Sequence, residues 1–404
     1  MLKIDALAEK RHLCSKSGQT GSSGRIALKT TKTRMKRVFL RAHFCWLFFG
    51  LPTICFSQRF IKTADSIRKI RTIPGMAYAI FTSDCILDWG VSGRRKMGSN
   101  DSIRMKDRWN IGTNTAAFTS YIAGSLVERG KIKWTTRLIE VFPELKKKIP
   151  LAYQGSTLVS LLSHQANVPL YAQIDEWSKT PSLPGNDTVT RRKAFITYIL
   201  TPKSPADTMA SRKRKGFSVA GYVIATAMLE KVSGKSWEKM VDEYINRPLG
   251  ISIKFGWPNK TDTAAPWGHG DIGGYFHAEG PDTWVGFNPI LNPALNINIS
   301  LRDYVKFMQE NLRGLLGKRA HLNPQIFKLL HFGVLDNALG WNNGSLENYS
   351  FSFHEGISLL FNCRAEIIKE KNIGVLVLAN SSDNDARAGV LNLTRILEQY
   401  GLNR

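Results

Sequence analysis

Runs of apolar residues divide the chain into strands near both ends and helices between them. Residues 74–81 and 86–91 are two β-rich runs on either side of a polar turn at 82–84, which predicts a hairpin. Three runs near the C-terminus also predict strands: 351–354, 359–368 and 373–379. The last run is apolar on both faces, so we expect it at the centre of a sheet.

Helical periodicity dominates the middle of the chain. Apolar residues recur at helical spacing between 237 and 245. Thr113 is expected to cap a helix over 114–129 that ends at Gly130. The other predicted helices cover 158–162, 218–232, 300–312 and 390–397. Two segments rich in Pro, Gly and polar residues are predicted to be loops: 171–190 and 255–300.

This order of elements predicts an α/β protein of the α+β sandwich type. One antiparallel sheet would be built from both chain ends and flanked by helices, with a mostly helical lobe inserted at roughly 114–285. We expect a cleft between the sheet and the lobe, which is a usual place for a ligand.

The first 57 residues do not fit that domain. Basic residues from Met35 onward precede a short apolar run over 44–56 and then polar residues, which is the order of a secretory signal peptide. We expect cleavage after Ser57, with 58–404 as the mature, exported chain (periplasmic or extracellular) without a transmembrane span. The alternative is a short membrane anchor. Residues 1–34 are interpreted as a non-native extension or a disordered basic tail.

The chain is strongly basic, with a net charge of +24. Residues 1–34 contribute +6 and residues 35–57 contribute +3, so the mature part carries about +15. That excess favours an anionic envelope polymer or lipid as a partner, and no motif points to nucleic acid. The run Arg212-Lys213-Arg214-Lys215 is either a solvated loop or an anion-binding rim of the cleft.

No cofactor or metal site is expected from the cysteines and histidines. Cys85 and Cys363 are expected to be buried free thiols, with a disulfide between them left open. His164, His269 and His277 match no standard metal-ligand spacing, so structural roles are favoured.

Nine blocks in sequence order resemble the serine β-lactamase-related family, which includes class C β-lactamases, penicillin-binding proteins and esterases. The blocks lie at 73–77, 110–120, 126–132, 161–164, 217–222, 230–236, 339–341, 354–356 and 372–380. The resemblance implies the β-lactamase/transpeptidase fold over 58–404. It also implies acyl transfer by a serine that a lysine one helical turn away and a tyrosine activate.

The residues that carry this chemistry in the family are largely replaced here. The S-x-x-K motif reads Thr113-Asn114-Thr115-Ala116, which keeps a hydroxyl but loses the amine. The Y-x-N motif reads Phe217-Ser218-Val219, which loses the phenol and the amide. The K/H-x-G motif survives as His354-Glu355-Gly356, and Leu295 stands where relatives often have glycine. Among these family positions only Thr113 and His354 could act chemically.

Three functions remain open at this point. The first is a catalytically impaired family member that binds a small molecule or peptidoglycan-like ligand in its cleft. The second is an esterase, peptidase or β-lactamase that uses Thr113 as nucleophile and His354 as base, which requires the two side chains to meet. The third is a basic surface protein that binds anionic polymers, through 212–215 and similar clusters.

Overall fold

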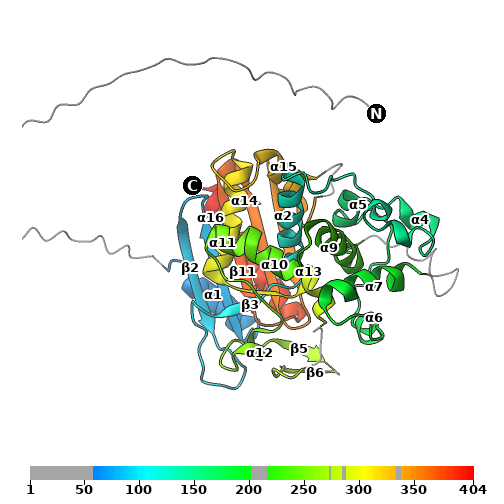
Figure 1. Cartoon of the computed structure of the whole chain (residues 1–404). Helices are drawn as coiled ribbons and strands as arrows, with labels where there is room; N and C mark the ends of the chain where they lie inside the picture. Colours follow the sequence, from blue (N-terminus) through cyan, green and yellow to red (C-terminus); the bar gives the residue numbers. More distant parts are fainter. Residues whose placement is uncertain (1–57, 202–215, 273, 284–287, 334–337, 347) are drawn as a thin grey trace, which may run out of the picture. The chain divides into compact units, whose positions relative to one another are not determined.

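A six-stranded antiparallel sheet joins strands from near both ends of the described chain (Figure 1). Its strand order is β2-β1-β11-β10-β9-β8. The strands are β1 (Gly75–Phe81), β2 (Ile86–Gly93), β8 (Asn342–Leu346), β9 (Tyr349–Ile357), β10 (Asn362–Ile368) and β11 (Ile373–Ala379). Tyr78 of β1 lies opposite Val377 of β11, so the predicted central strand and the sheet built from both chain ends are confirmed.

The computed structural model describes residues 58–201, 216–272, 274–283, 288–333, 338–346 and 348–404. The predicted leader, the extension before it and the basic run at 212–215 lie outside these residues. Within the described ranges, no helix has both the length and the apolar character that a membrane crossing requires.

Each face of the sheet is covered by helices, because successive side chains of a strand point to opposite faces. Met76, Tyr78 and Ile80 pack in one core with α1 (Ile61–Ile70) and α16 (Asn384–Leu402). Ala77, Ala79 and Phe81 belong to the larger core on the other face. The helices of that second core nearest the sheet are α2 (Thr115–Glu128), α14 (Leu301–Leu315) and α15 (Pro324–Phe332).

The inserted lobe is mostly helical, as predicted (Figure 1). Its helices are α3 (Leu138–Val141), α4 (Leu151–Gln154), α5 (Leu158–Leu162), α6 (Ile174–Ser178), α7 (Thr188–Leu200), α9 (Val219–Ser233), α10 (Trp237–Val241), α11 (Arg247–Leu249), α12 (Pro258–Thr261) and α13 (Asn292–Leu295). Single helical turns lie at η1 (Gly112–Asn114), η2 (Pro143–Leu145), η3 (Asp242–Asn246), η4 (Pro289–Leu291) and, outside the lobe, η5 (Lys369–Lys371). Ser218 caps α9 and Gly234 ends it in a left-handed conformation, so the helix is close to the predicted range of 218–232.

Both segments predicted as loops contain regular structure. Within 171–190 the chain forms α6, and α7 then begins where the Asp187 carboxylate accepts the Thr190 N–H. Strands of two small sheets lie in or next to 255–300: β7 (Ile297–Ser300) pairs with β3 (Arg108–Asn110) and β4 (Lys254–Phe255), and β5 (His269–Ile272) pairs with β6 (Tyr275–Ala278). In the first sheet the partners are distant in sequence, as in Trp109 opposite Ile299, so local composition did not reveal it. The second sheet is a local hairpin, with His269 opposite Ala278, which the sequence analysis missed.

Cys85 and Cys363, the two cysteines among the described residues, are both free. Cys363 is buried, as expected. Cys85 is exposed, so the expectation of burial was wrong there. It lies in the tight turn between β1 and β2, where its carbonyl accepts the Thr82 N–H, and a turn at the sheet edge leaves the side chain in solvent.

Candidate active site

The end of β9 packs directly against η1, the turn that carries Thr113. A Cβ atom at Gly356 would lie 2.3 Å from the Ile111 carbonyl oxygen. A Cβ atom at Gly112, where φ is +52°, would lie 2.5 Å from the Ile357 carbonyl oxygen. Two glycines therefore allow the two backbones to approach more closely than any side chain permits. This contact brings the first and third family motifs together.

The Thr113 hydroxyl is hydrogen-bonded to the backbone of β9. It donates to the Glu355 carbonyl oxygen at 3.1 Å and accepts the Ile357 N–H at 3.3 Å. The prediction that Thr113 caps the helix was wrong, because α2 begins after Asn114 with no side-chain cap and the hydroxyl has these other partners. Among the described residues, no hydrogen bond joins Thr113 to His354.

Ala116 and His354 both lie beside Gly340. Ala116, the second residue of α2, is fully buried. A Cβ atom at Gly340, where φ is +83°, would lie 2.8 Å from the Ala116 carbonyl oxygen. His354 is buried, and its Nδ1 donates to the Gly340 carbonyl oxygen at 2.7 Å. This hydrogen bond places the proton on Nδ1 and leaves Nε2 as the acceptor of the neutral ring.

Phe217 lies between two imidazoles. Its ring centroid is 4.8 Å from that of His164 and 5.9 Å from that of His354. It also stacks on Tyr222 at 5.7 Å. Phe217 is partly exposed, and Val219 is buried at the first position of α9. Phe217, which the resemblance places at the position of the family's tyrosine, is thus the central ring of an aromatic cluster.

Both imidazoles of this cluster are neutral at physiological pH. Burial lowers the pKa of His354 to about 4, although the Gly340 carbonyl and the Glu355 charge oppose the shift. Burial and the nearby His354 lower the pKa of His164 to about 3. Since His164 Nδ1 accepts the Ser218 N–H at 3.0 Å, its proton is on Nε2.

Asn114, the last residue of η1, contacts the side chains of Tyr304 and Cys363, and we did not predict a role for any of the three. Asn114 donates through Nδ2 to the Tyr304 hydroxyl at 2.8 Å and to the Cys363 sulfur at 2.9 Å. Burial raises the pKa of Tyr304 and of the Cys363 thiol well above their ordinary values. Both groups stay protonated and neither is a nucleophile or a base. Only the position of Asn114 inside the first motif could have indicated this contact.

The sequence model of the family described as Beta-lactamase matches residues 60–399. The chain belongs to the beta-lactamase family. Penicillin-binding protein 4 of Amycolatopsis lactamdurans is 23% identical to it over 189 residues, which are 46% of this chain and 46% of that protein. The match therefore covers less than half of that relative's length.

Two solved structures of family members share the fold. The octameric penicillin-binding protein homologue from Pyrococcus abyssi has a TM-score of 0.65 and 19% identity, over 84% of this chain and 77% of that one. The class C beta lactamase from Rhodobacter sphaeroides has a TM-score of 0.62 and 15% identity, over 83% of this chain and 99% of that one. At these identities the likeness concerns the fold alone.

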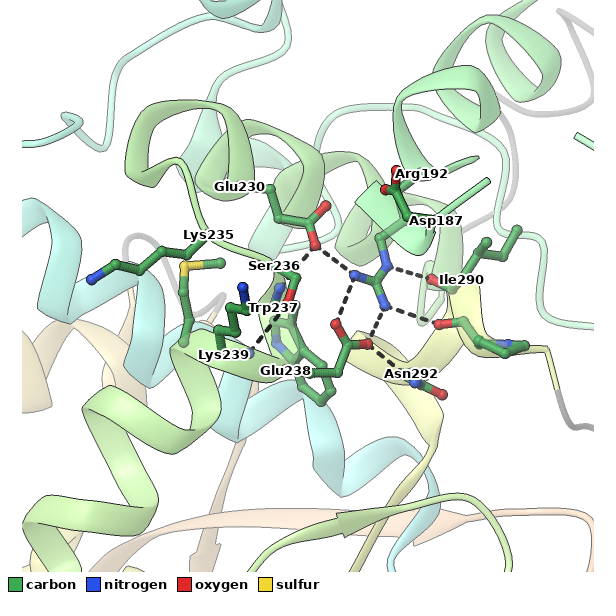
Figure 2. A network of polar contacts seen from close by, with 12 residues as sticks. Asp187, Arg192, Glu230, Lys235, Ser236, Trp237, Glu238, Lys239, Ile290 and Asn292 are labelled. Carbon is green, nitrogen blue, oxygen red and sulfur yellow. Dashed lines mark hydrogen bonds and ion pairs between the residues drawn. The ribbon is translucent and has the colours of Figure 1, made fainter. Parts of the chain in front are cut away.

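A buried ion network around Arg192 connects helices of the inserted lobe (Figure 2). The Arg192 guanidinium contacts Glu230 at 2.5 Å and Glu238 at 2.6 Å. It also donates to the carbonyl oxygens of Pro289 and Ile290 at 2.9 and 3.2 Å. Arg192 and Glu230 have no exposed side-chain surface, and burial raises the pKa of Glu230 despite the adjacent arginine. The network ties α7 to α9, α10 and η4.

Helix α10 of this network is also connected to α13 and α2, and both of these helices adjoin η1. Asn292 donates to Glu238 at 3.2 Å, which anchors α13 and with it the buried Leu295. The Thr119 hydroxyl donates to the Pro293 carbonyl oxygen and accepts the Trp237 indole N–H. Helices α2, α10 and α13 are therefore connected by one hydrogen-bonded chain. Neither this series of hydrogen bonds nor the role of Arg192 was predicted, because no helix was assigned to the residues of α7.

The other two histidines considered as metal ligands have structural partners. His269 donates through Nδ1 to the Asn380 carbonyl oxygen and accepts the Met97 N–H through Nε2. Both of its nitrogen atoms are therefore occupied. His277 contacts the Glu279 carboxylate at 2.7 Å and the Tyr275 carbonyl oxygen at 2.8 Å.

Proposed function

We propose that this chain is an exported member of the beta-lactamase family that has lost efficient acyl transfer and uses the site for binding. The observation that carries the proposal is the pairing of the Thr113 hydroxyl. Its proton is directed to the Glu355 carbonyl oxygen, which cannot act as a base. A hydroxyl nucleophile needs a neighbouring base to take its proton, and Ala116 provides none.

His354 is the remaining candidate base, and its hydrogen bonding does not favour that role. Its Nδ1 is committed to the Gly340 carbonyl oxygen, and its lowered pKa makes it a weak proton acceptor at neutral pH. The alternative function, hydrolysis by Thr113 with His354 as base, would require the hydroxyl to leave both of its partners on β9.

A binding role is supported by the side chains that replaced the polar motif. Phe217 offers a partly exposed aromatic face beside two neutral imidazoles, which suits a ligand with apolar or ring surfaces and few charges. The relatives named as penicillin-binding proteins favour a peptidoglycan-like ligand. The signal-like segment at 35–57 and the basic mature chain favour a location in the envelope or outside the cell.

The catalytic half of the proposal is tested by turnover. Hydrolysis of a chromogenic cephalosporin and of a p-nitrophenyl ester would be measured for the parent chain, Thr113→Ala and Thr263→Ala. Thr263 is an exposed threonine outside the site and serves as the matched control. We expect all three proteins to give the same rate, close to that of buffer. A rate that Thr113→Ala abolishes and Thr263→Ala preserves would establish the alternative function.

The binding half is tested by calorimetry with a soluble disaccharide-pentapeptide fragment of peptidoglycan. We expect binding by the parent chain and a loss of about tenfold in affinity for Phe217→Ala, since stacking and burial of one aromatic side chain contribute about 1–2 kcal/mol. Binding that Phe217→Ala leaves unchanged, or no binding by the folded parent chain, would contradict it.

A further inference from the structure

A basic and apolar patch lies on the inserted lobe, on the segment that follows η2 and includes the first two residues of α4. Lys146, Lys147 and Lys148 are consecutive and all exposed. Leu151, three residues further on, has a relative exposure of 82%, the highest value among the exposed large apolar residues of the described chain. Ala152 beside it is also exposed. We call these five residues the 146–152 patch.

The exposure of Leu151 belongs to a well-fixed segment. Leu145 and Ile149 on one side and Tyr153 on the other are buried in the main core. The Gln154 amide donates to the Lys146 carbonyl oxygen at 2.8 Å and to the Ile149 carbonyl oxygen at 3.3 Å. The backbone between these anchors therefore holds Leu151 outward. A leucine held in water gives up favourable burial, so a partner surface that covers it would stabilise the segment.

The positive charge of the patch is not compensated by the acids closest in sequence. Glu140 pairs with Arg137 at 2.8 Å, and Glu144 pairs with Lys193 at 2.7 Å. In the described part of the chain, no ion pair involves the three consecutive lysines. The patch therefore presents three unshared charges next to one protruding apolar side chain.

We propose that the 146–152 patch rests on an anionic lipid surface. A bilayer interface offers both parts of what the patch lacks: anionic headgroups for the lysines and an acyl boundary for Leu151. A soluble polyanion would satisfy the lysines but leave Leu151 in water. An apolar protein groove would cover Leu151 but not three like charges. This surface is separate from the candidate active site, so the inference does not depend on the proposed function.

Co-sedimentation of residues 58–404 with vesicles tests the proposal. This part of the chain is used because it lies within one compact unit that carries the family fold, and because the apolar run at 44–56 would bind vesicles by itself. We expect binding to phosphatidylglycerol/phosphatidylcholine vesicles and much weaker binding to pure phosphatidylcholine. Replacing Lys146, Lys147 and Lys148 by alanine should weaken binding about 100-fold, and Leu151→Ser about tenfold.

Two matched controls distinguish the patch from general charge and apolarity. Alanine at Lys62, Lys254 and Lys328, which are exposed and dispersed over other elements, removes the same charge. Ile70→Ser removes an apolar side chain with a relative exposure of 76% on α1. Both controls should bind like the parent chain, and unfolding curves confirm that all variants fold.

Three results would overturn the proposal. The first is a loss by the dispersed lysine control equal to that of the patch variant. The second is vesicle binding that is unchanged in Leu151→Ser and is displaced by a soluble polyanion such as polyglutamate. This result would assign the patch to anionic polymers instead of lipids. The third is no preference for anionic vesicles by the parent chain.

Discussion

Removal of the Arg192 guanidinium should destabilise this protein more than most single substitutions. Arg192→Met keeps the length of the side chain but leaves Glu230 buried without its cation, and it leaves the Pro289 and Ile290 carbonyl oxygens without their donor. Breaking one side of a buried ion pair costs about 3–5 kcal/mol, because the remaining charge stays desolvated. We expect a loss of that size in the free energy of unfolding, measured by urea denaturation.

The neighbouring ion pair provides the control. Lys193 follows Arg192 on α7 and pairs with Glu144, but both of those side chains are nearly half exposed. Exposed pairs contribute about 0–1 kcal/mol, so Lys193→Met should change the free energy of unfolding by less than about 1 kcal/mol. The double variant Arg192→Met/Glu230→Gln should be more stable than Arg192→Met alone. It removes the fully buried charge of Glu230, whereas the side chain of Glu238, the other carboxylate of the network, keeps 24% of its surface in solvent.

The same variant should have an altered pH dependence. Without the arginine, the folded-state pKa of Glu230 rises further above its unfolded value, since burial already raises it in the parent chain. A raised folded pKa adds stability at low pH that is lost as the pH rises through that pKa. The deficit of Arg192→Met should therefore be smaller at about pH 5 than at about pH 8. A deficit no larger than that of Lys193→Met, or one independent of pH, would refute this reasoning.

Three other predictions concern the site and the core. Gly356→Ala should lower the free energy of unfolding by about 3 kcal/mol or more, because its Cβ would lie 2.3 Å from the Ile111 carbonyl oxygen. Gly155→Ala, whose Cβ would have no atom within 4 Å, should leave it nearly unchanged, and denaturation curves of both variants decide this. Ala116→Lys should also cost about 3 kcal/mol or more, since it buries an ammonium at a fully buried position, and an unchanged midpoint would show that space and a partner exist there. Burial lowers the pKa of His331 to about 3, so the unfolded state takes up a proton before the folded state as the pH falls. Between about pH 7 and about pH 5, the free energy of unfolding of His331→Asn should therefore fall by about 2 kcal/mol less than that of the parent chain. Equal decreases in the two proteins would contradict this.

Except for β8, which was not predicted, the strands of the sheet could be predicted because they have strong local patterns. The run at 373–379 is apolar on both faces and became β11, which pairs with β1 on one side and β10 on the other. The helix predicted over 218–232 was also close to α9, since its ends depend on a few neighbouring residues around Ser218 and Gly234. These features are local in sequence. The β-lactamase/transpeptidase fold itself was inferred from the resemblance of nine blocks in the family's order.

The detailed site could not be predicted because it depends on contacts between distant segments. Thr113 has the residue type and position of a helix cap, but close packing of η1 on β9 gives its hydroxyl two partners there. Arg192 lies in a segment with mixed polar and apolar residues, and its burial follows only from carboxylates on α9 and α10. The candidate residues were thus identified by motif alone, while their hydrogen-bond partners required the structure.

Intact-mass spectrometry after incubation with a penicillin, and separately with a reactive fluorophosphonate, tests the loss of acyl transfer most directly. The mass shift would be recorded for folded residues 58–404 and for Thr113→Ala. Since the Thr113 hydroxyl is paired with the β9 backbone and Ala116 offers no base, we expect no covalent adduct with either reagent. A stoichiometric adduct that Thr113→Ala abolishes would show that the site still performs acyl transfer and would contradict the account.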